Sequence, residues 1–316
     1  MPTDTDGLLR FSASIGVALS PDHGKDFDRL AVAASDAMRH AKAAGRNTYQ
    51  IAQCGSTPLP NNYWELRSLL HRALDEGQFL LVYQPQYRLR DFKLVGLEAL
   101  VRWNRPGVGV VSPGEFIPIA EDSGLIVPLG HWVLREACLV LGRLMGEREE
   151  VPRIAVNVSV AQFQRSDFVA SVREVLEETG VPPDLLELEL TESVFLGQDR
   201  RALGAVSELR KIGVKLALDD FGTGYSSLSY LQEIKVDKIK IDQSFVKRIE
   251  KQASDQLLVK AIIKMARSFQ MTTIAEGVET PGALNTLRHL GCHEVQGYLT
   301  GRPGPLDDVL AAKVLF

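Results

Sequence analysis

The chain has 316 residues, 45% of them hydrophobic and 24% charged, which is typical of a soluble globular protein with one or two domains. The formal net charge of −4 gives no general attraction to nucleic acid polymers, so none is expected as a partner. No apolar run approaches the about 18 residues of a membrane span, so no membrane contact is expected. Three widely spaced cysteines without a CxxC pair argue against zinc and predict reduced thiols in the cytoplasm.

The N-terminal segment predicts few elements. Residues 11–19 predict a strand, residues 27–44 an amphipathic helix, and residues 46–52 a second short strand. One helix and two strands are too little for an independent core, so residues 1–53 are interpreted as a small α+β remnant of a domain. The segment 54–62, CGSTPLPNN, predicts a linker.

From residue 63 onward, apolar strand-like runs alternate with helical patterns. Strands are predicted over 79–87, 94–103, 153–159, 185–191, 214–220, 237–242, 272–278 and 294–299, and helices over 131–146, 165–179, 199–212, 253–268 and 280–290. In the helix at 253–268, the spacing predicts that Leu257, Leu258, Ile262 and Met265 face the core. This size and rhythm fit a (β/α)8 barrel.

The connection between the first two of these strands, RLRDFK, is far too short for a helical crossover. The two strands should therefore pair as an antiparallel hairpin. The predicted fold is α/β, a modified TIM (β/α)8 barrel with one antiparallel strand and seven parallel strands.

Polar side chains follow the apolar runs at the predicted strand ends, where the chemistry of such barrels is located. They are Glu98, Asn157, Glu189, Asp219 with Asp220, Lys240 with Asp242, Glu276 and Gln296. Six of these groups, five carboxylates and one amide, suit hard divalent cations, and two cations about 3.5–4 Å apart would use them all. Cation charge would also explain why Asp219 and Asp220 are adjacent. Any one such residue is usually a helix cap or a solvated charge, but capping explains such a succession poorly.

The segments GLEALVRW, NVS, ELTES, DDFGTGYSSLSYL, KIKID, AEGVET and EVQGYL resemble the EAL domain. This family comprises phosphodiesterases of the bacterial second messenger cyclic di-GMP, and the resemblance runs from about residue 64 to 316. The segments ASIGVAL and DAMRHAKAAGRNTYQI resemble the C-terminal part of a GGDEF (diguanylate cyclase) domain, whose signature is absent. The implied organisation is a GGDEF-like C-terminal fragment at 1–53, a linker at 54–62 and an EAL phosphodiesterase domain at 63–316.

The resemblance implies a role for individual residues. The implied ligands of one cation, Mg²⁺ or Mn²⁺, are Glu98, Asn157, Glu189 and Asp219, and those of a second are Asp219, Asp220 and Glu276. The implied catalytic residues are Lys240 at the attacking water, Glu276, Gln296 near a metal-bound water, and Glu192, which anchors the loop 221–233. The implied substrate contacts are Gln84, Leu100, Arg102, Asp242 and Glu279.

The activity that the resemblance implies is hydrolysis of cyclic di-GMP to linear 5'-pGpG by a two-metal mechanism. A homodimer is expected, formed through helices near the loop 221–233. A cytoplasmic location is also expected, although a longer protein could be anchored in a membrane upstream of this segment. Two alternatives are a non-catalytic cyclic di-GMP receptor and a barrel hydrolase of another phosphodiester. The family often differs at Lys235 and Thr300, but no expected metal position is lost, which favours the enzyme.

Overall fold

The structure is a computed structural model that describes residues 13–25, 27–43, 48–52, 63–195, 200–222 and 233–312. Its contacts divide the chain into two units, Met1–Leu69 and Leu70–Phe316, each of which is described by itself. The predicted linker at 54–62 and most of the loop 221–233 lie outside the described residues. The predicted domain borders therefore stay predictions.

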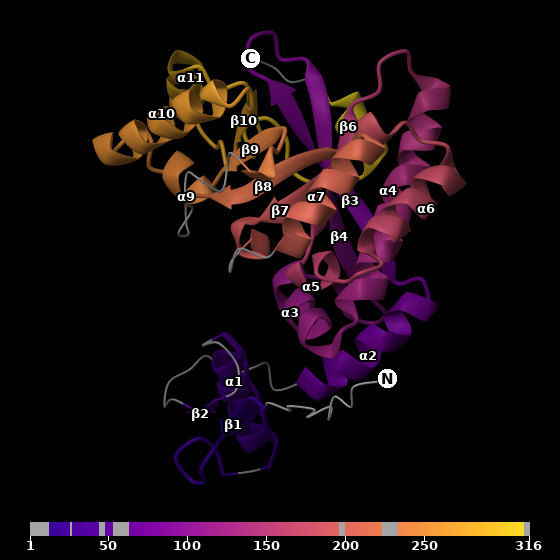
Figure 1. Ribbon diagram of the computed structural model, residues 1–316, viewed down its shortest axis with the longest axis vertical. Helices are drawn as coiled ribbons and strands as arrows, with labels where there is room; N and C mark the ends of the chain where they lie inside the picture. Colours follow the sequence, from indigo (N-terminus) through magenta and orange to yellow (C-terminus); the bar gives the residue numbers. More distant parts are fainter. Residues whose placement is uncertain are drawn as a thin grey trace, which may run out of the picture. The chain divides into compact units, whose positions relative to one another are not determined.

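The first unit contains the helix and the two strands that the N-terminal pattern predicts. Strands β1 (Ile15–Val17) and β2 (Tyr49–Ile51) pair in parallel. Helix α1 (Phe27–Ala43) follows β1 and precedes β2 along the chain (Figure 1). This is a β–α–β arrangement, in which the helix makes the crossover that a parallel pair requires.

The second unit is built around a closed barrel, and the first strand of this barrel follows helix α2 (Tyr63–Asp75). Its strands are β3 (Phe79–Arg88), β4 (Leu94–Arg105), β6 (Arg153–Val158), β7 (Leu186–Thr191), β8 (Lys215–Phe221), β9 (Lys238–Ile241), β10 (Thr272–Ala275) and β11 (Glu294–Val295). Their order is β3-β11-β10-β9-β8-β7-β6-β4, and β3 pairs with β4 to close the ring. A short strand, β5 (Gly109–Val111), extends the sheet beyond β4.

The antiparallel strand of the barrel is β3. It pairs antiparallel with both β4 and β11, whereas the other neighbouring strands of the barrel pair in parallel. The reason is the short connection that sequence inspection identifies, a tight turn in which the N–H of Phe92 donates to the carbonyl of Arg88 at 2.8 Å. The prediction of one antiparallel and seven parallel strands is confirmed.

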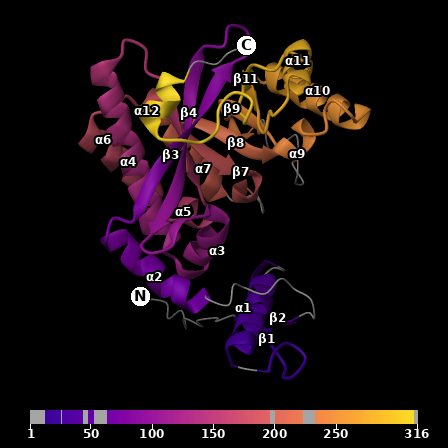
Figure 2. The same cartoon turned by 180° about the vertical axis from the view of Figure 1, so that it is seen from behind.

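Helices cover the outside of the barrel (Figures 1 and 2). They are α3 (Pro113–Ser123), α4 (Ile126–Glu147), α5 (Val160–Phe163), α6 (Phe168–Thr179), α7 (Arg200–Ile212), α9 (Gln243–Val246), α10 (Ala253–Ser268), α11 (Pro281–Leu290) and α12 (Leu306–Ala311), with 3-10 turns η1 (Pro183–Leu185) and η2 (Glu192–Phe195). The helix predicted from residue 131 begins five residues earlier, and α2, α3, α5, α9, α12 and β5 were not predicted. None of the helices in the described ranges has the length and apolar character that a membrane span requires.

The core lies between the strands and these helices. On β7, for example, Leu186, Leu188 and Leu190 belong to the hydrophobic core, whereas Glu187 and Glu189 alternate with them. Because successive side chains of a strand point to opposite faces, the glutamates point into the barrel. The interior of this barrel is therefore polar, which leaves room for charged chemistry.

One prediction about the core is wrong at two of its four positions, since Ile262 is buried and Met265 packs against the core. On α10, Leu257 is 67% exposed and Leu258 is 38% exposed, although the spacing predicts that both face the core. The buried side of α10 consists of Asp255, Val259, Ile262, Ile263 and Ala266. The first residue on this side is Asp255, whose carboxylate pairs with Arg248 at 2.8 Å. Because a charged residue is not expected on a buried face, the apolar pattern did not reveal this side of the helix.

Candidate active site

The centre of the barrel is occupied by the side chain of Lys240 on β9, which is only 1% exposed. Four carboxylates lie within 4 Å of its ammonium nitrogen. The distances are 2.5 Å to Glu189 on β7, 2.8 Å to Glu276 after β10, 3.0 Å to Asp219 on β8 and 3.8 Å to Glu98 on β4. The parallel strands bring these residues together, as predicted, and one positive charge faces four negative ones.

The crowding of charges changes the protonation of this group. Burial raises the pKa of Glu189 well above its usual range, and burial together with Asp219 and Glu98 raises the pKa of Glu276 to about 7. Burial disfavours the charge of Lys240, but the surrounding carboxylates raise its pKa well above its ordinary value. Without further positive charge, therefore, this set holds extra protons.

Glu98 is held differently, by amide donors. Burial opposes its charge, but Lys240 and the amides of Gln296 and Asn157 outweigh burial and lower the pKa of Glu98. Nδ2 of Asn157 donates to Oε1 of Glu98 at 2.7 Å, and Nε2 of Gln296 donates to Oε2. Nε2 of Gln296 also lies 2.9 Å from Oε1 of Gln84. This carboxylate is charged and fixed in orientation.

The paired aspartates at the end of β8 take different directions. Asp219 is buried, whereas Asp220 is exposed. Asp220 has a φ of 54°, a backbone conformation that residues other than glycine rarely adopt. Ligand atoms of Asp219, Asp220 and Glu276 lie within 4.8 Å of one another. At the start of η2, after the neighbouring strand β7, Oε1 of Glu192 accepts the N–H of Gly222 at 2.9 Å, which fixes the start of the loop after β8.

This donor set fits divalent cations. The carboxylates exceed the positive charge available, and the buried Oε1 of Glu189 has no hydrogen-bond partner among the described residues. A buried carboxylate oxygen without a donor is costly unless a cation contacts the carboxylate or a proton binds it. Oxygen donors without histidine or cysteine favour a hard cation such as Mg²⁺ or Mn²⁺.

A cavity of about 300 Å³ opens beside these carboxylates. Four predicted substrate contacts line it: Gln84, Leu100, Arg102 and Glu279. The fifth, Asp242, is not in the lining, and its Oδ1 instead accepts the N–H of Ser244 at 2.9 Å as the N-cap of α9. The predicted role of Asp242 in substrate binding stays a prediction.

Sequence inspection missed several residues of this cavity. They are Gln243, Lys247, Gly277, Gly297, Tyr298 and Pro303. The ammonium of Lys247 lies 3.5 Å from the carboxylate of Glu279, and the guanidinium carbon of Arg302 lies 4.2 Å from the ring centre of Tyr298. Tyr298 was detectable, because it is an aromatic residue two positions after the strand-end residue Gln296.

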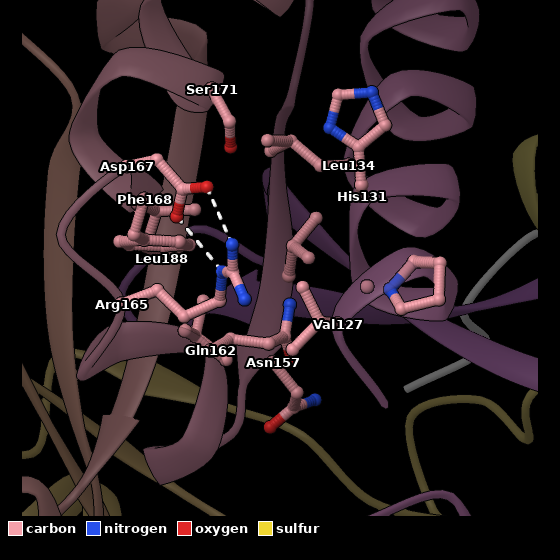
Figure 3. A pocket seen from close by; sticks show the side chains of 14 residues that line it. Val127, His131, Leu134, Asn157, Gln162, Arg165, Asp167, Phe168, Ser171 and Leu188 are labelled. Atoms are coloured by element: carbon pink, nitrogen blue, oxygen red, sulfur yellow. Dashed lines mark hydrogen bonds and ion pairs between the residues drawn. The ribbon is translucent and has the colours of Figure 1, made fainter. Parts of the chain in front are cut away.

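A second cavity of about 320 Å³ lies between α4 and the segment α5–α6. Figure 3 shows Arg165 paired with Asp167 on one of its walls, at 2.7 Å, and Asn157 among its lining side chains. Asn157 is the one predicted ligand in this lining, whereas the first cavity contains Glu98, Asp219 and Glu276. The acidic chemistry therefore belongs to the first cavity.

The family model described as EAL domain matches residues 67–303. The chain belongs to the EAL-domain family. The match spans every predicted site residue, from Gln84 to Gln296, and leaves the N-terminal strands and helix outside. The resemblance inferred from the motifs is therefore confirmed for the EAL domain, and the GGDEF-like fragment stays a prediction.

Named relatives align with most of the chain. The chain is 39% identical over 304 residues to the bifunctional diguanylate cyclase/cyclic di-GMP phosphodiesterase MucR of Pseudomonas aeruginosa, covering 96% of this chain and 44% of that protein. It is 39% identical over 298 residues to the cyclic di-GMP phosphodiesterase PdeR of Escherichia coli, covering 93% of this chain and 44% of that protein. The chain thus spans less than half the length of these relatives.

The barrel also matches solved EAL structures. The structure of the PaMucR phosphodiesterase in complex with c-di-GMP has a TM-score of 0.75 and 39% identity, with 78% of this chain and 99% of that chain covered. The uncovered part of this chain is of the size of the N-terminal unit. The comparison confirms the predicted modified TIM barrel as an EAL fold.

Proposed function

We propose that this chain is a phosphodiesterase that hydrolyses cyclic di-GMP to linear 5'-pGpG with two divalent cations, Mg²⁺ or Mn²⁺. The observation that carries the proposal is the set of four carboxylates within 4 Å of one buried ammonium. Such an excess of buried negative charge is stable only with added cations or protons. The activities for which MucR and PdeR are named support cyclic di-GMP as the substrate.

Two groups of residues would hold the cations. The first consists of Glu98, Asn157, Glu189 and Asp219, and the second of Asp219, Asp220 and Glu276. When bound, the cations would stabilise negative charge on the phosphoryl oxygens and make a water more acidic. The contribution of the chain is to hold these oxygens on rigid strand ends, which requires no rearrangement during the reaction.

Other side chains would bind and orient the substrate. Arg102 is half-buried in the cavity wall, and its Nη1 donates to the carbonyl of Val101 at 2.9 Å, which fixes the direction of the guanidinium. Among the described residues no carboxylate pairs with it at ion-pair distance, so its remaining donors are available to a phosphate in a forked contact. The half-exposed ring of Tyr298 offers a flat face at the cavity for a guanine base.

The reaction is an in-line displacement. The oxygen of water forms a bond to phosphorus, the bond to the ribose 3'-oxygen breaks, and that oxygen leaves with a proton. The ammonium of Lys240 lies at the centre of the carboxylates, where it would orient the water and offset developing negative charge. Glu192 would keep the end of β8 in place through Gly222.

The test is hydrolysis of cyclic di-GMP with Mg²⁺ or with Mn²⁺, followed by nucleotide chromatography, with EDTA as the control. We expect 5'-pGpG to form only when a cation is present. Tight binding of cyclic di-GMP without product would instead identify a receptor. If the chain neither bound nor hydrolysed cyclic di-GMP, the proposal would be refuted.

The proposal extends to the organisation of the protein. Residues 1–53 are proposed as the C-terminal fragment of a GGDEF-like domain, and residues 63–316 as the EAL phosphodiesterase domain of a longer signalling protein in the cytoplasm. The chain is also proposed to form a homodimer, which light scattering after size-exclusion chromatography would test. A monomeric mass at the concentrations used for the activity assay would contradict the dimer.

A further inference from the structure

A second buried lysine lies beneath the acidic site. Lys238 precedes Lys240 by two positions on β9, so both side chains point into the barrel. Lys238 is 2% exposed, and its ammonium nitrogen lies 2.8 Å from Oε1 of Glu187 and 2.9 Å from Oε2 of Glu294. These two carboxylates compensate its charge and fix its position.

The same ammonium makes a contact that leads toward the site. It donates to Oε1 of Gln86 on β3 at 3.2 Å. Gln86 is 1% exposed, and Gly96 on the neighbouring strand β4 makes room for it. A Cβ at position 96 would lie 2.5 Å from that same oxygen, so a larger residue there would displace the amide.

The direction of this amide follows from chemistry. An ammonium group has only donors, so Gln86 has to present its oxygen to Lys238 and its NH2 group to the opposite side. There Nε2 of Gln86 donates to Oε1 of Gln296 at 3.0 Å. The oxygen of Gln296 is thereby occupied, and its own Nε2 faces Oε2 of Glu98 and Oε1 of Gln84.

We propose that Gln86 is a positioning residue of the acidic site, linking Lys238 to Gln296 so that the amide nitrogen of Gln296 faces Glu98. Gln86 is not in the lining of the cavity and acts only through Gln296. With the amide of Gln296 reversed, an oxygen would face the carboxylate of Glu98 and repel it. The inference rests on the proposed function, because it assigns Glu98 to a cation.

The effect should appear in cation affinity. Removal of hydrogen bonds that orient a metal ligand, made by groups that do not contact the metal, typically lowers metal affinity by about 10- to 100-fold. Gln86→Met removes both hydrogen bonds but keeps a similar length and leaves Lys238 paired with two carboxylates. It therefore separates the direction of the amide from the filling of space.

The experiment measures Mn²⁺ binding by electron paramagnetic resonance of free Mn²⁺, using the full chain and no substrate. We expect Gln86→Met to bind Mn²⁺ about 10- to 100-fold more weakly than wild type. The matched control is Gln162→Met, since Gln162 is also buried but bonds within the capping box of α5. We expect this control to bind as wild type does.

Three results would overturn the proposal. Wild-type affinity in Gln86→Met would show that the amide only fills space, while the proposed function would stand. An equal loss in both variants would show a general packing effect. No Mn²⁺ binding by the wild-type chain would remove the proposed function and this inference with it.

A second measurement needs no variant, in case Gln86→Met fails to fold. With ¹⁵N-labelled glutamine side chains, the NH2 protons of Gln86 and Gln296 are expected to exchange with water at least about 100-fold more slowly than those of the exposed Gln243. Exchange as fast as that of Gln243 would exclude the hydrogen-bonded chain. Slow exchange of both amides would support it.

Discussion

The ammonium nitrogen of Lys240 lies 2.5 Å from Oε2 of Glu189, and both side chains are almost completely buried in the barrel. Neither charge would be stable alone there, because desolvating an unpaired ion costs several kcal/mol. The pair is nevertheless incomplete, since Oε1 of Glu189 has no hydrogen-bond partner among the described residues.

Glu98→Ala is expected to lower turnover of cyclic di-GMP by at least about 10³-fold, because a cation ligand contributes several kcal/mol to transition-state stabilisation. The fold should persist, since Nε2 of Gln296 keeps Oε1 of Gln84 as an acceptor, and loss of the acceptor of Nδ2 of Asn157 costs about 1–3 kcal/mol. Steady-state kinetics and circular dichroism check both statements. The control is Glu115→Ala, an exposed carboxylate on α3, and retained activity of Glu98→Ala in saturating Mg²⁺ would refute the ligand assignment.

Lys240→Met should destabilise the cation-free protein by about 3–5 kcal/mol, because it leaves buried carboxylates without their counter-charge. Saturating Mn²⁺ should restore part of this loss by replacing the missing charge. Urea unfolding in EDTA and in Mn²⁺ measures both values. Lys211→Met, at an exposed position, should change stability by less than about 0.5 kcal/mol, and equal losses with and without Mn²⁺ would contradict the argument.

The affinity for Mn²⁺ should depend on pH. Burial raises the pKa of Glu276 to about 7, so below pH 7 a proton occupies the carboxylate that a cation needs. The apparent affinity is expected to fall by about tenfold for each pH unit as the pH drops below 7. Titration calorimetry in two buffers of different ionisation enthalpy should also show proton release near pH 6, and a flat profile from pH 5.5 to 8 would rule out this coupling.

The thiols of Cys138 and Cys292 should be unreactive in the folded protein. Burial raises their pKa to about 12 and about 11, so little thiolate forms at pH 8, and both thiols are inaccessible. In a Cys54→Ser background, Ellman's reagent should label neither residue rapidly in buffer. Both residues should react in about 6 M guanidinium chloride, which unfolds the protein. Rapid labelling of the native protein would show that one of the two sites opens.

On helix α10, Val259→Ala should cost about 2 kcal/mol, since it removes buried methyl groups and leaves a small cavity. Leu257→Ala should cost less than about 0.5 kcal/mol, because that leucine is 67% exposed. The two substitutions lie on the same helix and both introduce alanine, so the free energies of unfolding measured in urea can be compared directly. A larger loss for Leu257→Ala would mean that another surface covers it.

Much of the acidic site was predictable because parallel strands bring their carboxyl ends to one side of a barrel. Apolar runs that end in Glu98, Glu189 or Asp219 are visible in the sequence, and the fold rule then places them together. The antiparallel strand was equally predictable, since six residues cannot hold a crossover helix. Both inferences depend on local pattern and on a general rule of topology.

Other features depend on contacts that no local pattern contains. The buried side of α10 begins with Asp255, whose charge is acceptable only because Arg248 pairs with it. Likewise, Gln86 resembles any polar residue of a half-exposed strand, and its burial follows from Lys238 on a distant strand. Polar residues inside the barrel are therefore the part that sequence patterns predict least well.

The strand that closes the barrel, β3, is made before the other strands of the barrel. β3 pairs with β11, near the other end of the chain, and the hydrogen bond between Gln86 and Gln296 joins residues 210 positions apart. During synthesis, β3 and β4 can form their hairpin early, but the other edge of β3 has no partner until β11 has emerged. The ring around the acidic site can therefore close only after β11 has been made, and a chain that stops before β11 would leave an open sheet edge beside the buried charges.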